Sequence, residues 1–303
     1  MNFFKNFLAS VLGTLTAIGL FFTLIVLLVS ATVSLIVSPS ATQPVKSNSV
    51  LDLILNVPII DRNPSFDELE VILGLNEEVL GLPEILSAIE KAAQNSDIQG
   101  IRLRSDYITA GWSQTRSIRN ALLKFKKQGK FIYSYADILS QKGYYLASVA
   151  DSIFLNPVGV FEFKGLASEV LYYKDFQDEY GVKMEVVRHG KYKSAVEPYL
   201  DNEMSAANRF QIESLLSSIW ETLRDEIATA RNLNTQNLDL LIKEHKVSTP
   251  EDAFAAQLID GLGYEKDIEN VIATRLDQEE GEDINFASIS AVNQTITDYN
   301  KEI

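Results

Sequence analysis

The sequence predicts an α/β protein with a mainly parallel sheet, preceded by one transmembrane helix. Two observations lead to this prediction. Short apolar runs alternate with helical patterns of about 10 to 15 residues from residue 51 to residue 275, which is typical of crossover units in a parallel sheet. Ahead of this region, no charged residue occurs between Lys5 and Lys46.

The apolar N-terminal stretch is long enough to cross a bilayer. Residues 7–37 include the run IGLFFTLIVLLV, and a bilayer core needs about 20 apolar residues, whereas a cleaved signal peptide has an apolar region of only about 7 to 15. We therefore expect residues 7–37 to be a retained anchor in the lipid bilayer. Lys5 and the terminal amine place residues 1–6 in the cytoplasm. Residues 38–50, rich in Ser, Pro and Thr, predict a linker to a globular part outside the cytoplasm.

The alternating pattern can be assigned segment by segment. The predicted strands are residues 51–60, 98–104, 131–135, 152–156 and 184–189. The predicted helices follow Pro83, end at Gly129, lie near residues 142–150 and 171–180, and begin at Ser205 and at Thr249-Pro250. Residues 51–275 would thus form one unit, while residues 276–303 read as an acidic linker, EEGED, and a further strand at which a second repeat could begin.

Composition excludes several classes of function. The formal net charge is -14, from 27 basic and 41 acidic residues, which argues against a nucleic-acid partner. The sequence has no cysteine and only two histidines, His189 and His245, so it predicts no thiolate nucleophile, no metal site and no disulfide. It also lacks GxGxxG, GxxxxGK[ST], HExxH and GxSxG, and we expect no cofactor.

Four segments in order resemble the signal peptide peptidases of the SppA (protease IV) type, peptidase family S49, in their long two-repeat form. They are GIRLRSDYITAGWSQTRSIRNAL (100–122), LSQKGYYLASVADSIFLNPVG (139–159), GLASEVLYYKDFQDEYGVKMEVVRHGKYKSAVEPY (165–199) and MSAANR (204–209). The resemblance implies a ClpP/crotonase-like fold of repeated strand-helix units and a serine endopeptidase that degrades cleaved signal peptides with a Ser-Lys dyad. It also implies a homo-oligomer in the bacterial inner membrane, with the catalytic domain on the periplasmic side.

The resemblance assigns the general base to Lys193, and places the nucleophilic serine in a C-terminal repeat that these 303 residues do not contain. A lysine accepts a proton from a serine hydroxyl only when neutral, so its pKa must fall below the usual value of about 10.4. The candidates to desolvate it are Ala195, Val196 and Tyr199. The candidates to disfavour its charge are Arg188 and Lys191. Taken alone, HGKYKS is typical of an exposed basic loop.

The nucleophile of the short, single-repeat relatives is absent. In those relatives a serine stands three places before a Tyr-Tyr pair, as Ser-Gly-Gly-Tyr-Tyr, whereas the place before Tyr144-Tyr145 holds Gln141. A glutamine cannot form the acyl-enzyme. Ser140 is the alternative, but a shift of one residue turns a helical side chain by about 100°.

Other polar residues near these motifs have ordinary structural roles as their favoured interpretation. Capping, packing or hydrogen bonding is expected for Ser105, Ser148, Ser194, His189, Asp106 and Asp137, and tight turns for Gly111 and Gly143.

Two hypotheses remain. In the first, this chain is the lysine-donating repeat of a membrane-anchored serine endopeptidase and is inactive alone. In the second, it is a non-catalytic, membrane-tethered module that binds peptides or organises a complex. Lys193 favours the first, whereas Gln141 and the end of the chain at Ile303 favour the second. Acyl-CoA chemistry has no support beyond fold analogy.

Overall fold

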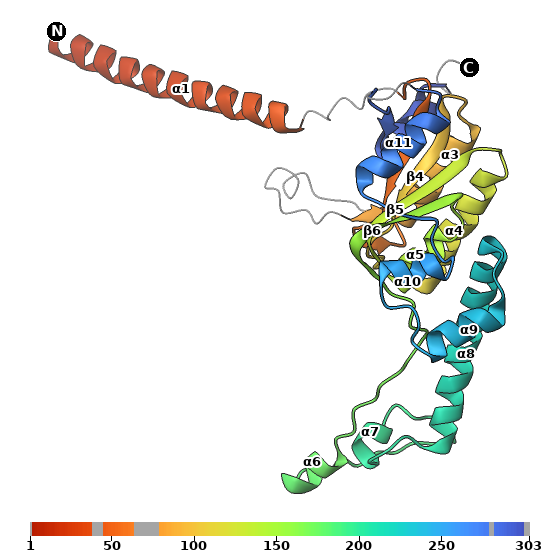
Figure 1. Ribbon diagram of the computed structural model, residues 1–303. Helices are drawn as coiled ribbons and strands as arrows, with labels where there is room; N and C mark the ends of the chain where they lie inside the picture. Colours follow the sequence, from red (N-terminus) through yellow and green to blue (C-terminus); the bar gives the residue numbers. More distant parts are fainter. Residues whose placement is uncertain (1, 38–44, 64–78, 279–281, 300–303) are drawn as a thin grey trace.

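The apolar N-terminal stretch forms one helix, α1 (Asn2–Val37), which stands apart from the other elements (Figure 1). The computed structural model describes residues 2–37, 45–63, 79–278 and 282–299. Within α1, residues 2–31 have a mean hydropathy of 2.5 and are not buried against the rest of the chain. The helix is long and apolar enough to span a membrane, as the sequence predicted.

A six-stranded sheet in the order β7-β6-β5-β4-β1-β8 forms the centre of the protein, and each of its strand pairs is parallel. Its strands are β1 (Ser49–Ile54), β4 (Ile98–Arg104), β5 (Phe131–Leu139), β6 (Ser152–Phe161), β7 (Gly261–Leu262) and β8 (Phe286–Ala287). The predicted parallel α/β fold is therefore confirmed.

The single strand predicted over residues 51–60 is divided in two. After β1 ends, β2 (Ile59–Ile60) pairs with β3 (Leu80–Gly81) in a separate two-stranded sheet. Pro58 directly precedes β2, and because proline has no N–H to donate to a ladder, it is suited to the start of a strand rather than to the interior of one.

Helices cover both faces of the six-stranded sheet. One cluster of buried side chains joins the sheet to α3 (Leu82–Gln94), α4 (Trp112–Lys126), α5 (Gln141–Ala147), α10 (Pro250–Ala255) and α12 (Ile289–Tyr299). A second cluster joins the other face to α11 (Glu265–Arg275). This two-sided burial explains why the strands read as apolar runs rather than as an alternating pattern.

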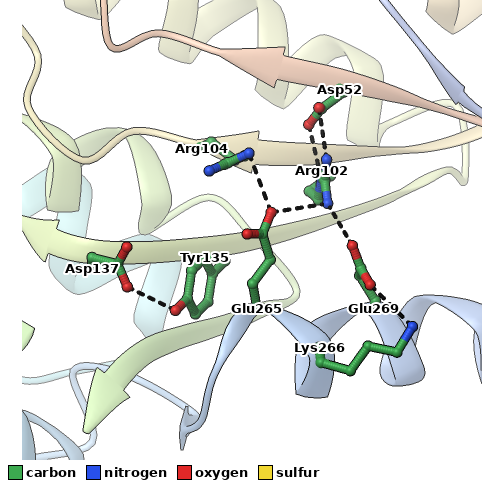
Figure 2. Close-up of polar contacts among 8 residues, drawn as sticks. All are labelled: Asp52, Arg102, Arg104, Tyr135, Asp137, Glu265, Lys266 and Glu269. Carbon is green, nitrogen blue, oxygen red and sulfur yellow. Dashed lines mark hydrogen bonds and ion pairs between the residues drawn. The ribbon is translucent and has the colours of Figure 1, made fainter. Parts of the chain in front are cut away.

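Between α11 and the strands that it covers, a network of charged side chains crosses the sheet (Figure 2). The Arg102 guanidinium on β4 donates to both oxygens of Asp52 on β1 at 2.8 and 2.7 Å, and lies 3.3 Å from Glu265 and 3.2 Å from Glu269 on α11. It also stacks on the ring of Phe286 at 3.7 Å. Arg102 is only 5% exposed, so this network holds β1, β4, β8 and α11 together and serves the fold.

Residues 164–218, which we call the arm, leave the sheet after β6 and return along α8 (Ala206–Arg231) (Figure 1). The arm contains the short helices α6 (Lys174–Glu179) and α7 (Glu197–Leu200). We call the remaining sheet and its covering helices the body. α9 (Thr235–Lys243) continues the chain beside α8.

The prediction of a strand at residues 184–189 was wrong. This segment has no regular secondary structure, and Met184 and Val187 are 43% and 105% exposed. An extended, apolar segment forms a strand only where a neighbouring strand accepts its hydrogen bonds, and within the described residues the arm supplies none. The helix predicted near residues 171–180 is also shorter, because α6 spans only Lys174–Glu179.

Candidate active site

Lys193 lies in an exposed loop of the arm, just before α7. Figure 1 shows α7 near the outer end of the arm, away from α5, which carries Gln141 at the position of the serine in the short relatives. Gly190 precedes the loop with a φ of 109°, a backbone conformation that glycine adopts without strain. The Lys193 N–H donates to the Gly190 carbonyl at 3.4 Å and closes the turn.

Arg188 and Glu197 hold this loop from both sides. Arg188 Nη1 donates to the Lys193 carbonyl oxygen at 3.3 Å and lies 3.8 Å from Glu197 Oε1. Glu197 is only 2% exposed and accepts from Ser205 Oγ at 2.6 Å, from Ser205 N at 3.3 Å and from Asn208 Nδ2 at 3.0 Å. These contacts join the Lys193 loop to the first turn of α8.

The carboxyl group of Glu197 is stabilised in its ionised form. Burial alone would raise its pKa, but the hydrogen bonds from Ser205 and Asn208 and the charge of Arg188 outweigh that effect, so the pKa lies below its ordinary value. Glu197 is therefore a charged anchor at neutral pH.

At the nucleophile position, the Gln141 side chain is fully engaged with backbone. Its Oε1 accepts from Lys164 N at 3.0 Å and from Gly165 N at 2.8 Å, and its Nε2 donates to the Gly165 carbonyl at 3.0 Å. Gln141 thus binds the segment by which the chain enters the arm.

Ser140 caps α5 and does not act as a displaced nucleophile in this arrangement. It is 7% exposed, and its Oγ accepts from Gly143 N at 3.2 Å. An N-cap hydroxyl used in this way stabilises the first helical turn.

The two predicted turn glycines also have their N–H groups engaged. Gly111 N donates to Gln114 Oε1 at 2.8 Å, and Gly143 N donates to Ser140. Neither N–H therefore points freely towards a reacting oxyanion. A side chain at Gly143 would overlap the Ser105 carbonyl oxygen, so this glycine permits α5 to approach the end of β4.

The remaining candidates have structural partners. Asp106 accepts from Asp137 N at 2.7 Å and from Asn56 Nδ2 at 3.1 Å. Asp137 accepts from Tyr135 OH at 2.8 Å, a contact visible in Figure 2.

Two serines near α5 also donate their hydroxyl groups to backbone carbonyls. Ser148 Oγ donates to the Tyr145 carbonyl at 2.9 Å and Ser105 Oγ to the Gly143 carbonyl at 3.3 Å. His189 and Ser194 lie in the arm beside Lys193, and His189 is exposed.

Two features of the site were missed by sequence reasoning. One is Glu197, which stands inside the segment KYKSAVEPY. Its place four residues after Lys193 was the signal that could have identified it. The other is Glu226 on α8, which accepts from Tyr145 OH and pairs with Arg116 at 2.7 Å. Its position on a long, mostly exposed helix gave no signal.

The chain is similar to known proteases. Residues 124–279, just over half of the chain, match peptidase family S49. The chain is 36% identical over 156 residues to Protease 4 of Haemophilus influenzae and 31% identical over 215 residues to Protease 4 of Salmonella typhi. It is 29% identical over 234 residues to the chloroplastic serine protease SPPA of Arabidopsis thaliana.

These matches cover 51%, 68% and 77% of the chain, but only 25%, 35% and 33% of the respective relatives. The chain therefore spans about a quarter to a third of the length of the curated relatives it matches.

Proposed function

The chain belongs to peptidase family S49, and from that premise we propose that it is the lysine-donating repeat of a membrane-anchored serine endopeptidase. Family membership by itself supports a protease function. The proposal adds that Lys193 is the general base of a Ser-Lys dyad, that a C-terminal repeat supplies the serine, and that cleaved signal peptides are the substrates.

One observation gives the main support for placing the lysine and the serine in different repeats. Lys193 is exposed at the outer end of the arm, whereas position 141 carries a glutamine bound to backbone. The chain thus presents Lys193 in a held loop and carries no serine at position 141, where the short relatives carry theirs. A partner surface that covers the loop would both bring the nucleophile and remove water from the amine, which favours its neutral form.

The chemistry follows from the two groups. The neutral amine of Lys193 takes the proton of the serine hydroxyl as the serine oxygen attacks the peptide carbonyl, and the resulting ammonium returns a proton to the leaving amine. Water then attacks the acyl-enzyme while the lysine amine accepts a proton from it. The ammonium returns this proton to the serine oxygen as the ester bond breaks, and the carboxylic acid product leaves and ionises in solvent. The oxyanion is stabilised by donors of the serine-bearing repeat, because Gly111 N and Gly143 N are already engaged.

The location of the enzyme is part of the proposal. Residues 7–37 serve as a single-pass anchor in a bacterial inner membrane, with residues 1–6 in the cytoplasm and the catalytic domain, residues 51–275, on the periplasmic side. α1 supports an anchor by its length and hydropathy. An anchored protease meets apolar peptides where they remain after cleavage, in the plane of the membrane.

Assembly into a homo-oligomer is supported by the surface of the arm. Its exposed large apolar side chains are Leu171, Tyr173, Phe176, Tyr180, Val182, Met184, Val187, Tyr192, Tyr199, Phe210 and Leu215. A soluble surface rarely leaves so many such side chains to water, and protein contacts commonly cover them.

Substitution of Lys193 tests the proposal directly. In the assembled enzyme with its serine-bearing repeat, Lys193→Ala should abolish hydrolysis of a signal-peptide substrate, while Lys183→Ala, at an exposed lysine of the same arm, should retain it. Undiminished turnover by Lys193→Ala would remove this residue from the mechanism. Tryptophan fluorescence checks folding, since Trp112 and Trp220 both pack against the core.

The engaged Gln141 favours a second candidate, a non-catalytic module that binds peptides. A serine-directed fluorophosphonate probe separates the two. If the probe labels the assembled protein, and if Lys193→Ala loses this labelling together with peptide hydrolysis, the result supports the peptidase. Peptide binding without labelling or hydrolysis supports the module.

A further inference from the structure

The short helix α5 contacts both segments by which the arm joins the body. The outgoing segment, residues 162–165, continues from β6, and the returning segment is the C-terminal half of α8. Gln141 and Tyr145 are four residues apart on α5, so they lie on the same face of this helix. We call the outgoing and returning segments the two roots of the arm. Gln141 binds the outgoing root and Tyr145 binds the returning root.

At the outgoing root, the three hydrogen bonds of Gln141 to Lys164 and Gly165 act as a substitute for a sheet ladder. The ladder between β5 and β6 ends just before this point, with Glu162 N donating to the Leu139 carbonyl at 2.9 Å. Gly165 has a φ of 78°, a left-handed backbone conformation that glycine adopts readily, at the start of the arm. The Gln141 amide therefore fixes the backbone at this glycine.

At the returning root, Tyr145 OH donates to Glu226 Oε2 on α8. Arg119 on α4 adds a bond to the Glu226 carbonyl at 2.9 Å, and Arg116 pairs with the carboxylate at 2.7 Å. Burial and the hydrogen bond to Glu226 raise the pKa of Tyr145, which keeps the phenol a donor at neutral pH.

Aromatic packing joins the two roots. The Tyr144 ring lies 5.1 Å from Phe161 and 5.5 Å from Phe163, and Phe163 lies 5.7 Å from Trp220 of α8. These rings are part of the body and continue its core up to the base of the arm. Beyond them, the arm has no buried hydrophobic side chain among its described residues 164–218.

Because the arm has no apolar core, its orientation relative to the body is set by its two roots. A small rotation at Gly165 or at the base of α8 is magnified at the outer end, where Lys193 lies. Misplacement of a catalytic group by about 1 Å can lower a rate by about 100-fold.

We propose that α5, the helix that carries the nucleophile in short relatives, serves in this chain as the clamp that positions Lys193, with Gln141 and Tyr145 holding the two roots of the arm. Gln141 is a positioning residue. It acts on the reaction through Lys193, and so this inference rests on the proposed function for its kinetic consequence but not for its structural one.

The structural consequence can be measured without activity. The chain has no cysteine, so spin labels can be placed at Lys124→Cys on α4 and Glu179→Cys on α6, both exposed positions. In the full chain in detergent micelles, diluted with unlabelled protein, Gln141→Ala should broaden the distance distribution between these labels and speed hydrogen exchange at Lys164 N and Gly165 N. An unchanged distribution and unchanged exchange would overturn the clamp.

Matched variants keep this test informative. Gln141→Glu retains an acceptor for Lys164 N and Gly165 N but loses the donor to the Gly165 carbonyl, and should give an intermediate result. Gln128→Ala, at an exposed glutamine of the body, should leave distance and exchange unchanged. If Gln141→Ala loses the tryptophan signal of the folded body, Gln141→Glu carries the test instead.

The kinetic consequence is measured in the assembled enzyme. Gln141→Ala should lower kcat about 10- to 100-fold with little change in KM, because substrate contacts remain while the base is misplaced. Gln141→Glu should restore part of kcat. A raised KM with unchanged kcat would overturn the positioning role.

The two proposals fail separately. If Lys193→Ala retains full turnover, the proposed function fails, while broadened distances in Gln141→Ala would still support the clamp. If Lys193→Ala is inactive and Gln141→Ala matches the parent in distance, exchange and kcat, only the clamp fails.

Discussion

The body of the protein buries apolar side chains, whereas the arm buries only polar ones. Leu53, Leu103 and Ile153 in the sheet are fully buried. In residues 164–218 the buried side chains are Gln177, Glu197 and Asn208, at 8%, 2% and 5% exposure. Hydrophobic burial scales with the apolar area removed from water, so the body holds its shape by itself while the arm depends on directional hydrogen bonds and on its two roots. A lysine carried on such an arm can be placed against another surface.

The largest expected difference between the two regions is in core substitutions. Leu103→Ala on β4 should lower the free energy of unfolding by about 2 to 5 kcal/mol because it leaves a cavity. Leu215→Ala in the arm, at 60% exposure, should change it by less than about 0.5 kcal/mol. Chemical unfolding followed by the fluorescence of Trp112 and Trp220 measures both. Equal losses would show that the arm is stabilised as part of the body.

Gly143 gives the next effect, in the body at the clamp helix. Gly143→Ala should cost about 1 to 3 kcal/mol, because its Cβ would overlap the Ser105 carbonyl oxygen and displace α5. The matched control is Gly111→Ala, whose Cβ would lie 3.7 Å from Gln114 Oε1, an ordinary contact, at a φ of -66°. Thermal unfolding distinguishes them. Equal stability of the two variants would contradict the close approach of α5 to β4.

A smaller and more local effect is expected at Glu197. Glu197→Gln should speed hydrogen exchange at Ser205 N about tenfold, the equivalent of about 1.4 kcal/mol lost from charge-assisted hydrogen bonds, with little effect on the body. Glu213→Gln, at an exposed carboxylate of the same arm, is the control.

Protonation of the Glu197 carboxylate should destabilise the arm at acid pH. The pKa of Glu197 is lower in the folded protein than its ordinary value of 4.5, so its stabilisation is complete above that pH. The stabilisation is lost as the pH falls through the lower folded-state value. Protection of Ser205 N should therefore hold at neutral pH and decline below about pH 4.5, and a decline beginning at neutral pH would contradict this assignment.

The smallest effect is expected for an exposed ion pair of the arm. Arg209 and Glu213 are 4.0 Å apart on α8 with both side chains more than 60% exposed. Arg209→Ala should change the free energy of unfolding by less than about 0.5 kcal/mol at physiological salt. A larger loss, measured by chemical unfolding, would mean that this part of α8 is covered by another surface in solution.

The body could be predicted from sequence because its signals are local. Pro83 and Glu84 begin α3, Gly129 ends the α4 turn with a φ of 81°, and the run at residues 98–104 forms β4 as expected. Apolar period, capping residues and proline act within a few positions of the chain. They therefore determined the α/β class, the parallel sheet and the apolar helix at the N-terminus.

The conformation of the arm was decided by tertiary structure alone. Residues 184–189 have the composition of a strand, but strand formation needs a partner that local sequence does not specify, and here the segment stays exposed. The sequence likewise showed that Gln141 is not a nucleophile, but only the fold showed what it does instead. Its partners, Lys164 and Gly165, lie more than 20 positions along the chain, and a hydrogen bond across that separation exists only once β5, α5 and β6 are packed together.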